Sequence, residues 1–226
     1  MTELTSLSDD VSIAALQLGL RYIYTASVPG DVVEFGCYQG STANALAEGM
    51  KKAEGHLLVA DRQAGIATRK LWLFDSFDGL PEATHPIDAD CPHVKSGAWR
   101  WRPAEPKPTP DLMYQICSRH LPRERIDVVP GWYKNTLPLI PSDAKFAFVH
   151  IDCDLYESTY QVLDRLLGHD HLSDGCALFF DDWYCNRGNP KWGERKAFAD
   201  IGDKYDIRIT DMGPYGVVGH RFLVHR

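Results

Sequence analysis

Four aspartates in the C-terminal half of the sequence have the spacing of a metal-binding set. An Asp-Cys-Asp segment at 152–154 follows the apolar run 146–151, and an Asp-Asp pair at 181–182 follows the apolar run 176–180. Both runs are typical of buried strands. Carboxylates at the carboxyl ends of neighbouring parallel strands converge where open α/β sheets bind ligands, and they repel one another unless a cation joins them. Oxygen ligands without Cys or His at metal-binding spacing favour a hard ion such as Mg²⁺.

Each of these acidic residues also has a simpler interpretation. Asp154 suits the N-cap of a helix that begins near Leu155, and the pair 181–182 suits a solvated turn. We favour the metal site because all the simpler interpretations would have to hold at once. His150, inside the preceding strand, is interpreted as a buried core histidine rather than as a contact to a substrate.

A second candidate binding region is the segment 34–41, Glu-Phe-Gly-Cys-Tyr-Gln-Gly-Ser. Its Gly-x-x-x-Gly turn matches neither the Gly-x-Gly-x-x-Gly pattern of dinucleotide sites nor a P-loop. Glu34 would repel phosphates, so the turn suits a ligand that carries an ammonium group and a ribose. The alternative is that the glycines only satisfy the backbone geometry of a strand-to-helix turn.

Asp75 strengthens the prediction of a nucleoside ligand. It ends a second expected strand, where a carboxylate is placed to accept hydrogen bonds from both hydroxyls of a ribose. Its alternative role is a turn cap, since Ser-Phe-Asp-Gly-Leu-Pro follows at once. We favour the ligand role because Asp75 and the glycine turn fall at matching topological positions.

The elements that must position these residues alternate along the chain. Expected strands cover 31–35, 71–75, 126–129, 146–151 and 176–180, and expected helices cover 13–23, 42–52, 111–120, 155–167 and 192–204. The alternation predicts a parallel sheet with right-handed crossovers. The tail is expected to form an antiparallel hairpin from 207–210 and 217–225 around Gly-Pro-Tyr-Gly. We therefore predict an α/β fold with a seven-stranded, mostly parallel sheet and helices on both faces. A terminal antiparallel hairpin on such a sheet resembles the usual order of the class I methyltransferase (Rossmann-like) fold.

Composition limits the remaining possibilities. A chain of 226 residues with a net charge of −7 fits a single domain without a nucleic-acid partner. Six cysteines without Cys-x-x-Cys spacing, an acidic N-terminus and the lack of a long apolar run predict a cytoplasmic protein without membrane contact. We expect an N-terminal helix within 1–28. The segment 82–110, rich in Pro, His and Trp, is predicted to be a lid or acceptor-binding insertion rather than a plain surface loop.

The sequence resembles the macrocin O-methyltransferase family, whose members use S-adenosylmethionine and Mg²⁺ to methylate sugar hydroxyls of antibiotics and related natural products. The motifs that carry the resemblance lie at 33–36, 74–81, 131–138, 150–156 and 181–182. The Asp-Ser-Phe-Asp-Gly-Leu-Pro and Asp-x-Asp-Leu-Tyr motifs are specific, whereas the glycine turn is not.

The resemblance implies roles for individual residues. Metal ligands would be Asp152, Asp181 and Asp182, and the general base would be Asp154. The residues implied to bind the cofactor are Glu34, Gly36, Tyr38, Gly40, Ser41, Asp75, Ser76, Gly131, Trp132 and Asp152.

These roles predict an enzyme that methylates a hydroxyl of a small-molecule acceptor, with Mg²⁺ chelating a vicinal diol and Asp154 taking the proton. The resemblance also suggests a homo-oligomer. One alternative is a catechol-type O-methyltransferase, whose aromatic pocket Trp99, Trp101 and Trp183 would supply. The other is a non-catalytic binding protein that retains the fold. Its buried carboxylates would then be costly without a function.

Overall fold

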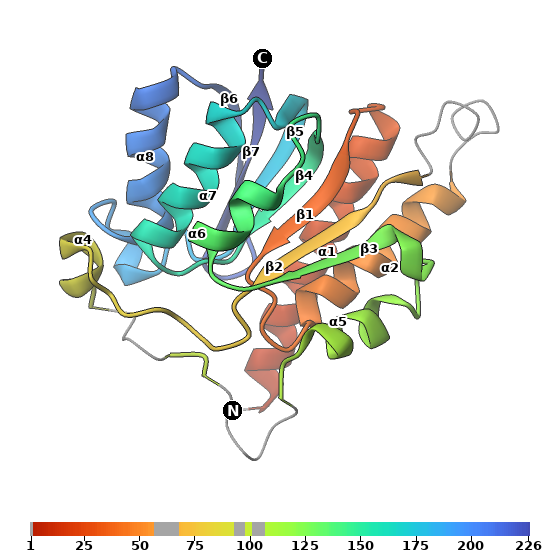
Figure 1. Ribbon diagram of the computed structural model, residues 1–226, viewed down its shortest axis with the longest axis horizontal. Coiled ribbons are helices and arrows are strands. Elements are labelled where there is room, and N and C mark those ends of the chain that lie inside the picture. The colour runs from red at the N-terminus through yellow and green to blue at the C-terminus, as the bar shows by residue number, and fades with distance from the viewer. Residues whose placement is uncertain (1, 57–67, 93–97, 101–106) are drawn as a thin grey trace.

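The computed structural model describes residues 2–56, 68–92, 98–100 and 107–226. One sheet of seven strands, in the order β3-β2-β1-β4-β5-β7-β6, runs through the middle of the molecule (Figure 1). Its strands are β1 (Asp31–Phe35), β2 (Leu71–Asp75), β3 (Ile126–Pro130), β4 (Phe146–Ile151), β5 (Leu172–Phe180), β6 (Arg208–Tyr215) and β7 (Gly219–His225). The first five are parallel, and β7 pairs antiparallel with both β5 and β6.

Helices cover both faces of the sheet (Figure 1). One face packs against α1 (Thr2–Thr25), α2 (Ser41–Gly55) and α5 (Pro110–Cys117), and the other against α6 (Tyr133–Thr136), α7 (Tyr156–Gly168) and α8 (Gly193–Tyr205). Shorter helical turns are α4 (Pro86–Ala89), η2 (Arg123–Arg125), η3 (Leu137–Leu139) and η4 (Asn186–Gly188).

Two hydrophobic cores result because successive strand side chains point to opposite faces. On β5, Ala177 and Phe179 belong to the core beneath α1 and α2, whereas Leu178 and Phe180 belong to the core beneath α7 and α8. All six residues of β4 are buried. A central parallel strand covered on both faces is expected to be this apolar, so the predicted fold class is confirmed.

The strand order reverses between β1 and β4, although these two strands are parallel. Strands β1, β2 and β3 extend the sheet to one side, and β4 and β5 extend it to the other. This is the switch point at which open α/β sheets bind ligands beyond the carboxyl ends of the strands. The glycine turn, Asp75 and both acidic segments therefore lie at one edge.

The C-terminal hairpin forms, but its turn differs from the expected one. Strand β6 continues through Gly213 and Pro214 to Tyr215, and the turn comprises residues 216–218. Pro214 is compatible with this strand because β6 is the outermost strand of the sheet, where a missing N–H breaks no ladder hydrogen bond.

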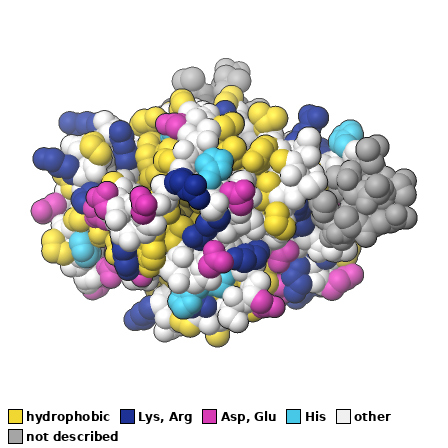
Figure 2. All heavy atoms as spheres, turned by 90° about the horizontal axis from the view of Figure 1, so that it is seen from above, with side chains coloured by type: hydrophobic (Ala, Val, Ile, Leu, Met, Phe, Trp, Pro, Cys, Tyr) yellow, Lys and Arg dark blue, Asp and Glu magenta, His cyan; other side chains and the backbone are white. Residues whose placement is uncertain are grey.

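The end of the molecule opposite the carboxyl edge of the parallel strands is seen from above in Figure 2. It carries basic and acidic side chains that are interspersed with one another. At this amino end of the strands, Asp170 pairs with Lys145 at 2.6 Å and with Arg226 at 3.5 Å. The Asp170 side chain is exposed, so these pairs contribute little to stability.

The contact between α1 and the sheet is tight enough to exclude a side chain at Gly19. A Cβ there would lie 2.6 Å from the ring of Phe179 and 2.8 Å from the ring of Phe148. We predict that Gly19→Ala lowers the free energy of unfolding by about 1 kcal/mol, because overpacking outweighs the higher helix propensity of alanine. Thermal melts would show a decrease of about 2–4 °C.

Gly55→Ala is the matched control. Gly55 also lies in a helix, and nothing lies within 4 Å of a Cβ built on it. The melting temperature of the Gly55→Ala variant should equal that of the wild type or be slightly higher. Equal melting of the Gly19→Ala variant and the wild type would show that α1 shifts to admit a methyl group.

Candidate active site

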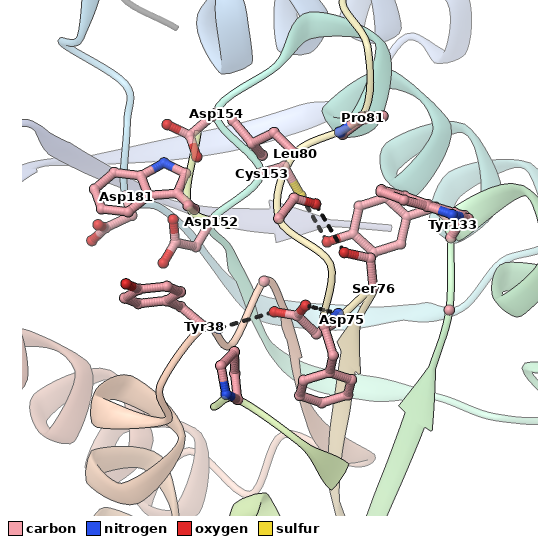
Figure 3. Close-up of a pocket in the computed structure, with 18 of the residues that line it drawn as sticks. Tyr38, Asp75, Ser76, Leu80, Pro81, Tyr133, Asp152, Cys153, Asp154 and Asp181 are labelled. Carbon is pink, nitrogen blue, oxygen red and sulfur yellow. Dashed lines mark hydrogen bonds between the residues drawn. The ribbon is translucent and has the colours of Figure 1, made fainter. Parts of the chain in front are cut away.

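A cavity of about 420 Å³ lies at the carboxyl edge of the sheet (Figure 3). Its acidic wall residues are Asp75, Asp152, Asp154, Asp181 and Asp182. Gly36, Tyr38, Ser76, Gly131 and Trp132 also line it. Among the described residues of the wall there is no Lys, Arg or His. The cavity is therefore strongly acidic and suits a ligand set that includes a cation.

The ends of β4 and β5 bring the acidic segments together. The N–H of Asp152 donates to the carbonyl of Phe35 on β1, and the N–H of Asp181 donates to the carbonyl of Ile151, both at 2.9 Å. The chain leaves the sheet immediately after each of these hydrogen bonds. Carboxylate oxygens of Asp152, Asp154 and Asp182 consequently lie within 4.8 Å of one another.

Burial and mutual repulsion make these carboxylates hard to ionise. Burial raises the pKa of Asp152 well above its ordinary value, and the nearby carboxylates of Asp181 and Asp182 raise it further. Burial likewise raises the pKa of Asp154, with Asp182 adding to the effect. A divalent cation would favour the ionised forms. Carboxylate oxygens are the ligands that Mg²⁺ prefers, so the residues present fit that ion.

Asp181 contacts a group of buried polar side chains beneath the cavity. The Tyr215 hydroxyl donates to Asp181 Oδ1 at 3.3 Å, and His150 Nε2 lies 3.8 Å from the same oxygen. The other ring nitrogen of His150 lies 2.9 Å from a carboxylate oxygen of Glu34. Burial alone would lower the pKa of His150, but the two carboxylates raise it to about 10. His150 is thus a fully buried core histidine.

The structure places most of the residues predicted to bind the cofactor on the cavity wall. Three do not line it. Glu34 is fully buried beside His150, a Cβ on Gly40 would contact α5, and Ser41 is exposed as the first residue of α2. Their roles in cofactor binding stay predictions.

Asp75 holds the glycine turn in addition to lining the cavity. Its carboxylate accepts hydrogen bonds from the backbone N–H groups of Cys37 at 2.7 Å, Tyr38 at 2.9 Å and Phe77 at 2.6 Å. Figure 3 shows Asp75 joined to the turn that carries Tyr38. Asp75 therefore caps this turn, which is the alternative role considered for it from the sequence.

Gly36 marks the closest approach between the glycine turn and the acidic segment. Its φ is +95°, and a Cβ built there would lie 1.9 Å from the carbonyl oxygen of Asp152. A side chain at this position is excluded by the backbone of its neighbour. The two halves of the candidate site are therefore in direct backbone contact.

The described parts of the segment 82–110 contact the site. The Trp99 ring packs against Tyr38 with 5.6 Å between centroids, and Trp99 lines the same cavity as Asp154. Asp88, from α4, accepts hydrogen bonds from the N–H groups of Tyr156 at 2.7 Å and Glu157 at 2.9 Å. Asp88 thus caps α7, a role that the sequence suggested for Asp154. The residues 93–97 and 101–106, with Trp101, lie outside the described residues.

Two residues near the site gave no signal in the sequence. One is Asp88, and the other is Glu194 on α8, which is 1% exposed and hydrogen-bonded to both acidic segments. An acidic residue near the start of a helix is usually solvated, so only the fold distinguishes these two. Trp183 packs in the core against Phe180 and does not line the cavity.

A comparison with known protein families shows the family to which the chain belongs. The family model described as "Macrocin-O-methyltransferase (TylF)" matches residues 9–196. The chain belongs to the macrocin O-methyltransferase family. This family consists of O-methyltransferases, so the protein is an enzyme, and the family implies S-adenosylmethionine as the methyl donor.

Similar proteins of this family come from actinomycetes. The 8-demethyl-8-(2,3-dimethoxy-alpha-L-rhamnosyl)-tetracenomycin-C 4'-O-methyltransferase of Streptomyces olivaceus is 28% identical over 208 residues, covering 89% of this chain and 70% of that protein. Mycinamicin III 3''-O-methyltransferase of Micromonospora griseorubida is 32% identical over 201 residues, covering 86% of this chain and 69% of that protein. The matched region thus leaves part of each relative uncovered.

Solved structures confirm the fold. The O-methyltransferase NovP superposes with a TM-score of 0.72 at 23% identity, covering 95% of this chain and 79% of that chain. A calicheamicin methyltransferase superposes with a TM-score of 0.68 at 23% identity, covering 99% of this chain and 80% of that chain.

Within the described residues, every helix is too short or too polar to cross a bilayer.

The backbone contact at Gly36 leads to a prediction for binding. Gly36→Ala should weaken binding of S-adenosylhomocysteine about tenfold or more, because the new methyl group pushes the glycine turn away from Asp152. Isothermal titration calorimetry measures this directly. Gly202→Ala is the control, since a Cβ there would meet its nearest neighbour, Ile207, at an ordinary 3.8 Å. Unchanged affinity in the Gly36→Ala variant would contradict the close approach.

Proposed function

We propose that this enzyme transfers the methyl group of S-adenosylmethionine to a hydroxyl of a sugar or glycosylated natural product, with Mg²⁺ bound at the acidic segments. The observation that carries the proposal is the convergence of three carboxylates within 4.8 Å in a cavity whose described wall has no basic side chain. The sugar-modifying activities named for its relatives support the acceptor class.

The methyl donor is assigned to the side of the cavity formed by the glycine turn, Asp75, Ser76, Gly131 and Trp132. Asp152 and Asp182, two members of the 4.8 Å cluster, would hold the metal ion together with Asp181, which lies outside that cluster but lines the same cavity. When bound, Mg²⁺ lowers the pKa of a coordinated hydroxyl and orients a vicinal diol. Asp152 is shared by both halves of the site, because Gly36 contacts its carbonyl.

Asp154 is assigned as the general base. It is 7% exposed and lines the cavity. Burial and the neighbouring Asp182 carboxylate raise its pKa, so the carboxylate is more ready to accept a proton. The acceptor hydroxyl would be held between Asp154 and the metal ligands, in line with the methyl group. Trp99 would limit access of water from the outer side.

A catechol-type acceptor is the second candidate. Trp99 and Trp132 place two aromatic rings on the cavity wall, which suits a phenol. Trp183, proposed from the sequence for the same pocket, is in the core instead. Methyl transfer to a rhamnoside compared with a catechol, both with Mg²⁺, distinguishes the two acceptor classes.

The first test is thermal unfolding with S-adenosylhomocysteine, followed by addition of Mg²⁺ or EDTA. A ligand at about 100 times its dissociation constant adds about 2.7 kcal/mol, which corresponds to about 5–10 °C for a chain of this size. Mg²⁺ should raise the melting temperature further and EDTA should reverse that rise. If Mg²⁺ leaves the melting temperature unchanged, the proposed metal site is wrong. If S-adenosylhomocysteine leaves it unchanged, the proposed cofactor site is wrong.

A second test separates the base from the metal ligands. Asp154→Asn should reduce turnover by about 10²–10⁴-fold while Mn²⁺, a spectroscopic substitute for Mg²⁺, still binds within a few-fold of the wild type. Asp181→Asn should instead weaken Mn²⁺ binding. Asp164→Asn, on the outer face of α7 and paired with Lys204, is the control and should leave both unchanged. The reverse pattern would make Asp154 the third ligand, as its position beside Asp152 and Asp182 allows.

A further inference from the structure

Glu194 is a buried carboxylate that contacts both acidic segments of the site. It is the second residue of α8 and is 1% exposed. One of its carboxylate oxygens accepts a hydrogen bond from the N–H of Cys153 at 3.2 Å, and the other accepts one from the N–H of Asp182 at 2.9 Å. A single side chain therefore bridges two segments that follow different strands.

These hydrogen bonds continue the sheet where its own ladder ends. The last ladder bonds are those from Asp152 to Phe35 and from Asp181 to Ile151. The next amide in each segment, that of Cys153 or Asp182, donates to Glu194 instead. Without this acceptor, the Cys153 amide would be a buried donor lacking a partner, at a cost of about 1–3 kcal/mol, and the partly buried Asp182 amide would lose its acceptor as well.

The start of α8 packs closely against the Asp-x-Asp segment. Gly193 has a φ of +59°, and a Cβ on it would lie 3.1 Å from the carbonyl oxygen of Asp154. The helix thus contacts the segment at both Cys153 and Asp154. This second contact restricts where Glu194 can place its carboxylate.

Only a carboxylate suits this position. Two N–H donors need two acceptor oxygens, and a glutamine would direct its NH₂ group at one of them. The two oxygens of Glu194 each accept from an amide of a different segment, so the distance between them matches the distance between the two amides.

We infer that Glu194 is a positioning residue, which sets the separation of the two acidic segments and thereby the affinity of the site for a divalent metal ion. The inference rests on the proposed function. Residues that orient metal ligands without touching the metal typically change metal affinity by about 10–100-fold when they are replaced.

Mn²⁺ binding by Glu194→Gln tests the inference, measured by isothermal titration calorimetry together with binding of S-adenosylhomocysteine. Mn²⁺ affinity should fall by about 10–100-fold, whereas S-adenosylhomocysteine affinity without metal should stay within about twofold. If Glu194→Gln does not fold, Glu194→Asp keeps both acceptor oxygens and withdraws them by one methylene, and its Mn²⁺ affinity should also fall.

Glu54→Gln is the matched control. Glu54 is a poorly exposed carboxylate on α2 that accepts hydrogen bonds from Tyr24 at 2.8 Å and from Arg125. Its replacement should lower the melting temperature but leave Mn²⁺ affinity unchanged. Wild-type Mn²⁺ affinity in the folded Glu194 variant would overturn the inference alone. A wild-type protein that does not bind Mn²⁺ would overturn the inference and the proposed metal site together.

Discussion

The aspartates beyond β4 and β5 repel one another, and the surrounding contacts of the site hold them in place against this repulsion. Carboxylate oxygens from three of them lie within 4.8 Å of one another in a largely buried place. The parallel ladder supports the chain up to Asp152 and Asp181, and Glu194 supports the next residue of each segment. His150, beneath the cavity, is the nearby group whose charge opposes the repulsion. These contacts together hold like charges at a distance that a cation can bridge.

The sequence predicted the sheet well because its central strands are covered on both faces. Such strands are continuous apolar runs, and the acidic segments that end them fall at one edge by topology alone. Prediction failed at the hairpin turn, because Gly-Pro is a strong turn signal whereas an edge strand tolerates proline. Whether Pro214 lies in a turn or at an edge depends on pairing with β7, which is a tertiary property.

The site was predictable only where a residue's role follows from its position on a strand. Asp152 and Asp75 lie at strand ends, and both line the cavity. Glu34 also lies on a strand, but the alternation of side chains directs it to His150 beneath the site. Asp88 and Glu194 come from distant segments, and nothing in their local sequence distinguishes them from solvated acids. Their roles arise from the packing of α4 and α8 around the acidic segments.

The contact between Gly36 and Asp152 has a thermodynamic consequence. A Cβ on Gly36 would collide with the carbonyl of Asp152, so a displacement of the Asp152 backbone would be transmitted to the glycine turn. A ligand that moves this backbone from one half of the cavity would alter the free energy of occupying the other. Linkage requires that this effect be mutual and equal in size in both directions. A ligand that strengthens binding in the other half of the cavity by some factor is therefore itself bound more strongly by the same factor.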